Sequence, residues 1–180
     1  MTRRQGWALA AGILVAAGCG YTTRPGLASH LRTIYVKPFV NKIDLSQLSS
    51  GYDRFPVYRH AMEVELTKEV INRFQFTGLL RPTRAEEADC RLEGELVEYR
   101  RDPLRYTNDK QVEEWRLNLV VNLRFYDRTQ PGEPVWEEER YTGDTTYVAV
   151  GAGAESETTA LTRATQDLAR RIVERTVENW

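Results

Sequence analysis

The chain has 180 residues, of which 41% are hydrophobic and 28% are charged, with a formal net charge of −1. This length and composition are typical of one globular domain, and the near-neutral balance excludes general nucleic-acid binding, which needs a large basic excess. Residues 1–18 hold Arg3 and Arg4 and no acidic residue, so the chain without them has a net charge of about −3.

An uncharged segment near the N-terminus has the pattern of an export signal. Arg3 and Arg4 precede the uncharged run from Trp7 to Ala17. As a helix this run measures about 17 Å, whereas the apolar core of a bilayer is about 30 Å thick. The run is too short to span a membrane, so it is predicted to be a secretory signal.

Cys19 directly follows three small residues at positions 16–18, a pattern that resembles the lipobox of bacterial lipoproteins. We expect residues 1–18 to be removed as a lipoprotein signal peptide and Cys19 to carry the lipid that anchors the protein to a membrane. Residues 19–30 then form a lipidated tether. Gly20 stands where aspartate would retain a lipoprotein in many enteric-type bacteria, which indicates the outer membrane. The alternative is an ordinary signal peptide with a chance cysteine.

The next part of the chain changes from a strand pattern to a helix pattern. Thr33–Phe39 is rich in β-forming residues and is predicted to be a short strand. Residues 41–56 are polar and are predicted to be a loop. Residues 57–76 have a four-residue apolar repeat, which predicts a helix with one buried stripe. That stripe consists of Tyr58, Met62, Leu66, Val70 and Phe74.

The second half contains three alternating segments and a second helix pattern. Residues 88–100, 115–126 and 135–147 are predicted to be strands, and the polar segment 101–109 is predicted to be a hairpin loop. The clearest strand places six apolar residues on one face and mostly polar residues on the other. The six are Trp115, Leu117, Leu119, Val121, Leu123 and Phe125. Residues 158–180 are predicted to be an amphipathic helix.

The predicted order of elements is β-α-β-β-β-α. Two amphipathic helices need one apolar surface, and a four-stranded sheet with one apolar face supplies it. We therefore expect an α+β two-layer sandwich, with both helices packed on one face of the sheet, formed by a single domain of residues 31–180.

Residues that carry covalent or metal chemistry are few. His30 and His60 lack a cysteine or histidine partner at metal-ligand spacing, and no nucleophile or phosphate-loop motif is present. Cys90 alternates with charged residues and is predicted to be a buried core thiol. We expect no catalytic residue, no metal site and no cofactor, and therefore no enzyme.

Basic side chains form the one candidate binding site. Four of them cluster in the predicted hairpin loop and two lie on the polar face of the following strand. They are Arg100, Arg101, Arg105, Lys110, Arg116 and Arg124. Guanidinium groups bind phosphate through paired hydrogen bonds, so contact with a lipid A or inner-core sugar phosphate is one hypothesis. The alternative is a solvated loop that Asp102, Asp109 and Glu113 balance.

An ordered set of segments over nearly the whole mature chain resembles the lipopolysaccharide-assembly lipoprotein family LptE. No single segment is highly specific, and the resemblance rests on their order. The segments are Cys19-Gly20-Tyr21, residues 31–41, Glu65-Leu66-Thr67, residues 88–94, Trp115-Arg116-Leu117, Phe125-Tyr126-Asp127 and residues 168–173. Ala28 stands where that family often has proline.

This resemblance implies a function. Members of the family sit inside the lumen of the outer-membrane β-barrel LptD, act as its plug and assembly partner, and with it move lipopolysaccharide to the cell surface. It implies an outer-membrane lipoprotein that faces the periplasm, has an LptD-like barrel and lipopolysaccharide as partners, and catalyses no covalent reaction. The alternatives are a small envelope hydrolase, for which His60 is the sole candidate, and an adaptor for another envelope complex.

Replacing the predicted lipidated cysteine tests the anchor. The Cys19→Ala variant is expected to accumulate as a precursor that does not label with radioactive fatty acid, because no thiol remains at the lipobox. Cys90→Ala is the matched control and should label and mature normally. Normal labelling and processing of Cys19→Ala would show that the chain is not a lipoprotein.

Overall fold

The computed structural model describes residues 27–43 and 61–178. The predicted signal peptide, Cys19, most of the loop predicted at 41–56, and His60 lie outside these residues. The elements in chain order are β1 (Thr33–Val36), β2 (Val40–Asn41), α1 (Met62–Thr77), β3 (Arg81–Pro82), β4 (Cys90–Tyr106), β5 (Val112–Asp127), β6 (Trp136–Val148) and α2 (Glu157–Glu178).

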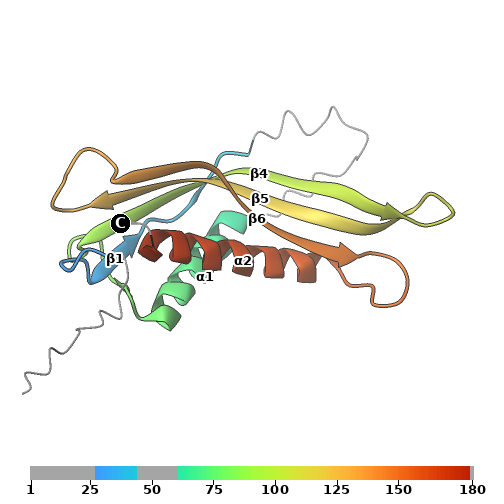
Figure 1. Cartoon of the computed structure of the whole chain (residues 1–180), viewed down its shortest axis with the longest axis horizontal. Helices are drawn as coiled ribbons and strands as arrows, with labels where there is room; N and C mark the ends of the chain where they lie inside the picture. Colours follow the sequence, from blue (N-terminus) through green and yellow to red (C-terminus); the bar gives the residue numbers. More distant parts are fainter. Residues whose placement is uncertain (1–26, 44–60, 179–180) are drawn as a thin grey trace, which may run out of the picture.

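The strands form one mixed sheet, and both helices lie on the same side of it (Figure 1). The strand order is β3-β1-β4-β5-β6, with β2 also paired to β4. β1 is parallel to β3 and β4, whereas β4, β5 and β6 are antiparallel. The α+β class and the placement of both helices on one face are confirmed.

The predicted four-stranded sheet and its order β-α-β-β-β-α are wrong, because the sheet has six strands. The two additional strands, β2 and β3, have two residues each. A two-residue strand is too short to produce an alternating pattern, and only its pairing with a neighbour defines it. β2 pairs with β4, and β3 pairs with β1, so both lie on the side of the sheet where β1 joins β4.

The predicted hairpin loop at 101–109 is also wrong, because β4 continues to Tyr106. Arg101 pairs with Leu117 and Pro103 with Trp115, so the ladder to β5 holds this charged segment extended. Pro103 lies where β4 no longer has β1 or β2 beside it, and an edge strand tolerates a residue without an N–H. The turn itself is shorter and closes with a hydrogen bond from Thr107 N to Gln111 O of 2.8 Å.

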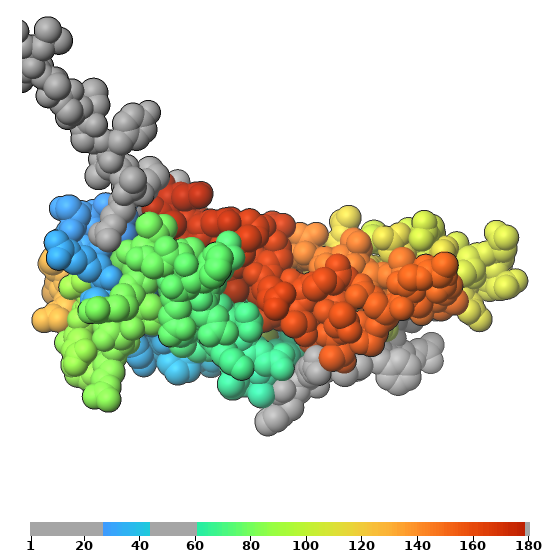
Figure 2. Space-filling view, turned by 90° about the horizontal axis from the view of Figure 1, so that it is seen from below, coloured from blue at the N-terminus to red at the C-terminus, as the bar shows by residue number. Residues whose placement is uncertain are grey.

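The core lies between the helices and the sheet. The helices cover much of one face, and the β4–β5 hairpin extends beyond them, as the space-filling view from below shows (Figure 2). On α1 the predicted stripe is confirmed at Met62, Leu66, Val70 and Phe74, and Gly78 ends the helix with a φ of 64°. All six predicted apolar residues of β5 are buried as well.

Helix α2 lies close against the sheet where β6 has a glycine. A Cβ atom at Gly143 would lie 2.5 Å from Leu168 Cβ and 2.8 Å from Leu168 Cα. The second of these atoms belongs to the helix backbone, which cannot turn aside as the tip of a flexible side chain can. The absence of a side chain at position 143 therefore sets the distance between α2 and the sheet.

Adding a methyl group at this contact is expected to destabilise the domain. Gly143→Ala should lower the free energy of unfolding by about 1–3 kcal/mol or more, because α2 must move away from β6. Thr146→Ala, at an exposed position of the same strand, is the control and should change it by less than about 0.5 kcal/mol. Denaturant unfolding of both variants measures the difference, and equal effects would contradict the close approach.

Candidate functional site

The face of the sheet opposite the helices, here called the open face, carries the polar side chains of the strands. Paired residues on neighbouring strands point to the same side of a sheet. Near the start of β4, Tyr35 pairs with Arg91, and Arg91 pairs with Tyr126. One arginine therefore lies between two tyrosines in a row across three adjacent strands.

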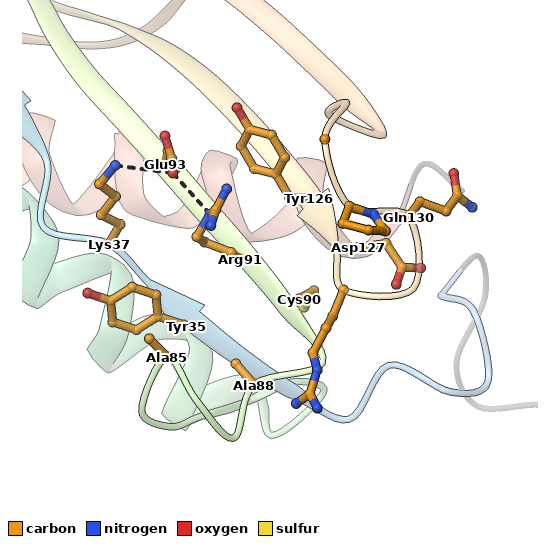
Figure 3. A pocket seen from close by; sticks show the side chains of 13 residues that line it. Tyr35, Lys37, Ala85, Ala88, Cys90, Arg91, Glu93, Tyr126, Asp127 and Gln130 are labelled. Atoms are coloured by element: carbon orange, nitrogen blue, oxygen red, sulfur yellow. Dashed lines mark hydrogen bonds and ion pairs between the residues drawn. The ribbon is translucent and has the colours of Figure 1, made fainter.

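A pocket of about 380 Å³ opens at this row, next to the turn that follows β5. Figure 3 shows Tyr35, Lys37, Arg91 and Tyr126 around it. Cys90 lines it at β4 and is 2% exposed, as predicted for a buried thiol. Burial raises the pKa of the Cys90 thiol well above its usual value, so it is not poised as a nucleophile.

The basic groups of the pocket contact a neighbouring ring and a shared carboxylate. The Arg91 guanidinium lies over the Tyr126 ring, 4.4 Å from its centroid, and its Nε lies 2.9 Å from Glu93 Oε1. Lys37 Nζ lies 3.2 Å from the same carboxylate oxygen. The Glu93 carboxylate is thus shared by two cations of the pocket.

The turn beside the pocket is stabilised by a buried carboxylate. Asp127 accepts hydrogen bonds of 2.7 Å from the backbone N and the Oγ1 of Thr129, and its other oxygen lies 2.7 Å from His30 Nε2. Burial acts to raise the pKa of Asp127, but these hydrogen bonds outweigh it and hold the pKa below its ordinary value. The contact fixes the segment before β1 against the end of β5.

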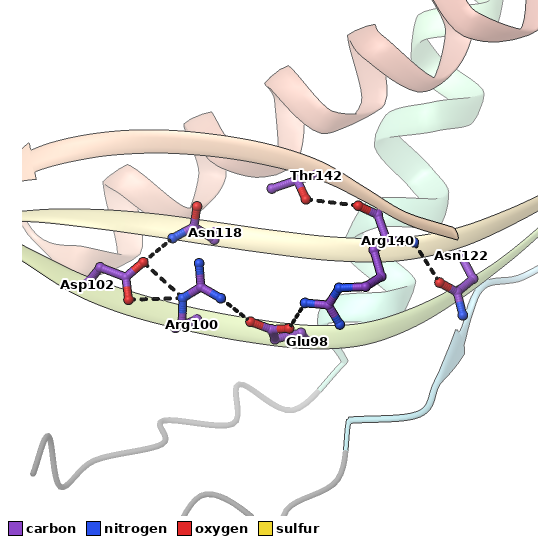
Figure 4. A network of polar contacts seen from close by, with 7 residues as sticks. All are labelled: Glu98, Arg100, Asp102, Asn118, Asn122, Arg140 and Thr142. Atoms are coloured by element: carbon purple, nitrogen blue, oxygen red, sulfur yellow. Dashed lines mark hydrogen bonds and ion pairs between the residues drawn. The ribbon is translucent and has the colours of Figure 1, made fainter. Parts of the chain in front are cut away.

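The other half of the open face carries a continuous ionic network (Figure 4). Arg100 donates to Glu98 and to both oxygens of Asp102, and Arg140 donates to the second oxygen of Glu98. Asn118 donates to Asp102 at 2.9 Å and is only 6% exposed. The strand face predicted to be mostly polar is therefore polar, and here its side chains are hydrogen-bonded to one another.

Arg101 lies on the opposite side of the sheet from Arg100. It donates to Glu157, the first residue of α2, at 2.7 Å and stacks over the Trp115 ring at 4.1 Å. Tyr99 and Tyr147 also donate to Glu157, at 2.6 and 3.4 Å. This cluster ties the start of α2 to the sheet. Burial and the bond to Glu157 raise the pKa of Tyr99.

Two further members of the predicted phosphate-contact set are balanced by acidic neighbours. Arg105 Nε lies 3.1 Å from Glu113, and Arg124 Nε lies 3.9 Å from Glu137. These side chains are about half exposed, so the pairs are screened by solvent and contribute little to stability. Both arginines keep donors available for another anion.

Lys110 and Arg116 make no side-chain ion pair or hydrogen bond with another residue in the described part of the chain. Lys110 lies in the β4–β5 turn with a φ of 60°, and Arg116 pairs in register with Asp102. The six predicted residues are thus not one patch. Arg100, Arg105, Arg116 and Arg124 share the open face, Lys110 is at its tip, and Arg101 faces the helices.

The prediction from sequence missed the basic residues of the pocket. Lys37 lies on the segment after β1 and Arg91 on β4, and 53 intervening residues separate them. Only the parallel pairing of β1 with β4 brings them together. The motif Tyr35-Val36-Lys37, with two polar residues on one strand face, was the available signal.

Within residues 27–43 and 61–178 no group of acidic, histidine or cysteine side chains could hold a metal ion. No helix in those same ranges is both long and apolar enough to cross a bilayer. What the described surface offers is an array of fixed cations and carboxylates suited to binding.

Comparison with known families matches this architecture to one of them. The family described as LptE, Lipopolysaccharide-assembly, matches residues 31–176, which is most of the chain. The chain belongs to the LptE family. This membership supports a role in lipopolysaccharide assembly, and the matched range covers every strand, the whole of α1 and all but the last two residues of α2.

Solved structures share the fold of this chain at low sequence identity. Protein XCC0632 from Xanthomonas campestris has 14% identity and a TM-score of 0.54, covering 87% of this chain and 91% of that one. Protein CT253 from Chlamydia trachomatis has 15% identity and a TM-score of 0.51, covering 81% and 95%. A minor lipoprotein from Acinetobacter baumannii has 15% identity and a TM-score of 0.50, covering 82% and 93%. No curated protein matches the sequence.

The buried Asp127 predicts how the stability of this LptE-family domain depends on pH. The pKa of Asp127 is lowered in the folded state. Its contribution to the free energy of unfolding is therefore complete above the unfolded pKa of about 3.9 and is lost as pH falls through the folded pKa. Asp127→Asn should therefore be less stable at pH 7 and lose less stability on acidification.

Thermal melts between pH 7 and pH 2 measure this difference. Asp109→Asn, in the exposed β4–β5 turn, is the control and should follow the wild type. A decline in Asp127→Asn as steep as that of the wild type would contradict the assignment of this acid sensitivity to Asp127.

Proposed function

We propose that this LptE-family chain is an outer-membrane lipoprotein, anchored through Cys19, that pairs with an LptD-like β-barrel in lipopolysaccharide transport. In this role the domain is the plug of the barrel lumen and faces the periplasm through its tether. The observation that carries the proposal is the family match over residues 31–176.

The surface of the domain supports a role as a plug. The interior of an outer-membrane barrel is polar, so a protein inside it needs a charged and well-ordered exterior. The network of Glu98, Arg100, Asp102 and Arg140 gives the open face that character. The exposed apolar side chains are scattered over several elements, as in Val64, Phe76 and Leu104, rather than gathered over the open face.

The rival function is a small envelope hydrolase. His30 is the one histidine within the described ranges, and its Nε2 is occupied by Asp127. Among the described residues no serine or cysteine is hydrogen-bonded to this pair, and Cys90 is buried with a raised pKa. A catalytic base needs a nucleophile within hydrogen-bond reach, so the arrangement favours a binding role.

For direct contact with lipopolysaccharide phosphate, Arg116 is the strongest member of the predicted set. It is exposed on the open face and has no carboxylate partner among the described residues, whereas Arg100 and Arg105 are engaged. Its donors are therefore free for a phosphate oxygen. The competing role for Arg116 is an ion pair with an acidic residue of the barrel wall.

Affinity purification from detergent-solubilised membranes tests the partnership. The tagged full-length protein is expected to recover a large β-barrel in a one-to-one complex, and recovery of soluble periplasmic proteins alone would contradict the proposal. An adaptor function would instead recover a different envelope complex, which mass spectrometry distinguishes.

Two matched charge reversals sharpen this test. Arg116→Glu is expected to weaken lipopolysaccharide binding by the purified protein, and Lys68→Glu, an exposed cation on α1, should leave it unchanged. Normal lipopolysaccharide binding with loss of the barrel complex would assign Arg116 to the barrel wall instead. Equal thermal melts for both variants exclude unfolding as the cause.

A further inference from the structure

We propose that the pocket between β1, β4 and β5 binds a phosphate group carried on a sugar or a ring of similar size. The juxtaposition that points to this ligand is Arg91 and Lys37 beside the rings of Tyr35 and Tyr126 (Figure 3). The site is independent of the barrel partnership and contains none of the six basic residues predicted from the sequence.

The strand register sets the width of the site. Tyr35, Arg91 and Tyr126 occupy one row on β1, β4 and β5. Neighbouring strands lie about 4.8 Å apart, so the two tyrosine backbones stand about 10 Å apart on either side of Arg91. This spacing accommodates one compact ring beside a cation, and aromatic side chains supply the flat apolar surface on which a sugar ring packs.

Arg91 is already oriented for an oxyanion. Stacking on Tyr126 at 4.4 Å fixes the plane of its guanidinium, and the contact of Nε with Glu93 fixes its rotation. A guanidinium has five N–H donors, and this contact uses the one on Nε. The two terminal nitrogens remain as a fork that matches two phosphate oxygens, and a donor held in place before binding loses less entropy on binding.

The local charge favours an anion. Lys37 and Arg91 share the single carboxylate of Glu93, and Arg128 adds a third cation at the rim. The other acidic residue of the pocket, Asp127, is already engaged by its own hydrogen-bond donors. A dianionic phosphate therefore meets more positive than negative charge here, whereas a neutral sugar does not use these groups.

The size of the pocket fits such a ligand. Its volume of about 380 Å³ lies at the lower end of the range for small-molecule sites. Ala88 and Cys90 are its small lining residues. Arg91 and Asp102 are eleven residues apart on β4, roughly 36 Å at 3.3 Å per residue, so this site and the surface around Arg116 are separate.

Calorimetric titration of the full-length protein in detergent tests the inference with three probes: glucose 6-phosphate, inorganic phosphate and glucose. Glucose 6-phosphate is expected to bind at least tenfold more tightly than either of the others, and its affinity should fall as salt is raised. Arg91→Gln should weaken binding at least tenfold, and Tyr126→Leu should weaken glucose 6-phosphate more than inorganic phosphate.

Lys68→Gln on α1 is the matched control and should bind like the wild type. Binding of glucose 6-phosphate by Arg91→Gln with wild-type affinity would overturn the proposal, as would the absence of binding by the wild type. Equal affinity for glucose 6-phosphate and inorganic phosphate would overturn the proposal that the pocket binds the sugar ring, and it would indicate a site for the free phosphate ion. None of these outcomes alters recovery of the barrel, so this inference and the proposed function fail separately.

Discussion

The antiparallel ladder between β4 and β5 is the interaction on which the other features of the domain depend. It runs from Cys90 opposite Asp127 to Tyr106 opposite Val112, so it spans the full length of both strands. Its inner side supplies the apolar surface for both helices, and its outer side supplies the open face. Because β1 and β6 are also aligned on this pair, the ladder fixes which distant residues meet.

A β-bulge within this ladder decides which arginines are available for binding. Leu96 pairs with Val121, but Glu98 pairs with the next residue, Val120, so Val97 is the extra residue. Before the bulge the even-numbered residues of β4 face the helices, and after it the odd-numbered residues face them. Arg101 therefore points inward to Glu157, and Arg100 points outward to the ionic network.

The sequence predicted the features that depend on local periodicity and missed those that depend on pairing between strands. The α1 stripe and the alternation of β5 follow from periodicities of about four and two residues, and both are confirmed in the structure. The strands β2 and β3 and the extension of β4 to Tyr106 exist because a neighbouring strand supplies hydrogen bonds, which composition does not reveal. For the same reason the six basic residues looked like one cluster, and the pocket residues Lys37 and Arg91 looked unrelated.

The two ends of the open face differ in how their cations are balanced, and this difference follows from strand pairing. Arg100 and Arg140 each meet a carboxylate on a neighbouring residue or strand, so their network is satisfied and can present a stable surface to a protein wall. Around Arg91, two cations converge on one carboxylate beside an open pocket. An added anion stabilises a satisfied ion-pair network little. It stabilises two cations that share one carboxylate and have oriented donors more strongly. Anion binding on this face is therefore favoured at the pocket where β1 joins β4 and at the unpaired Arg116, and protein contact is favoured at the network around Arg100.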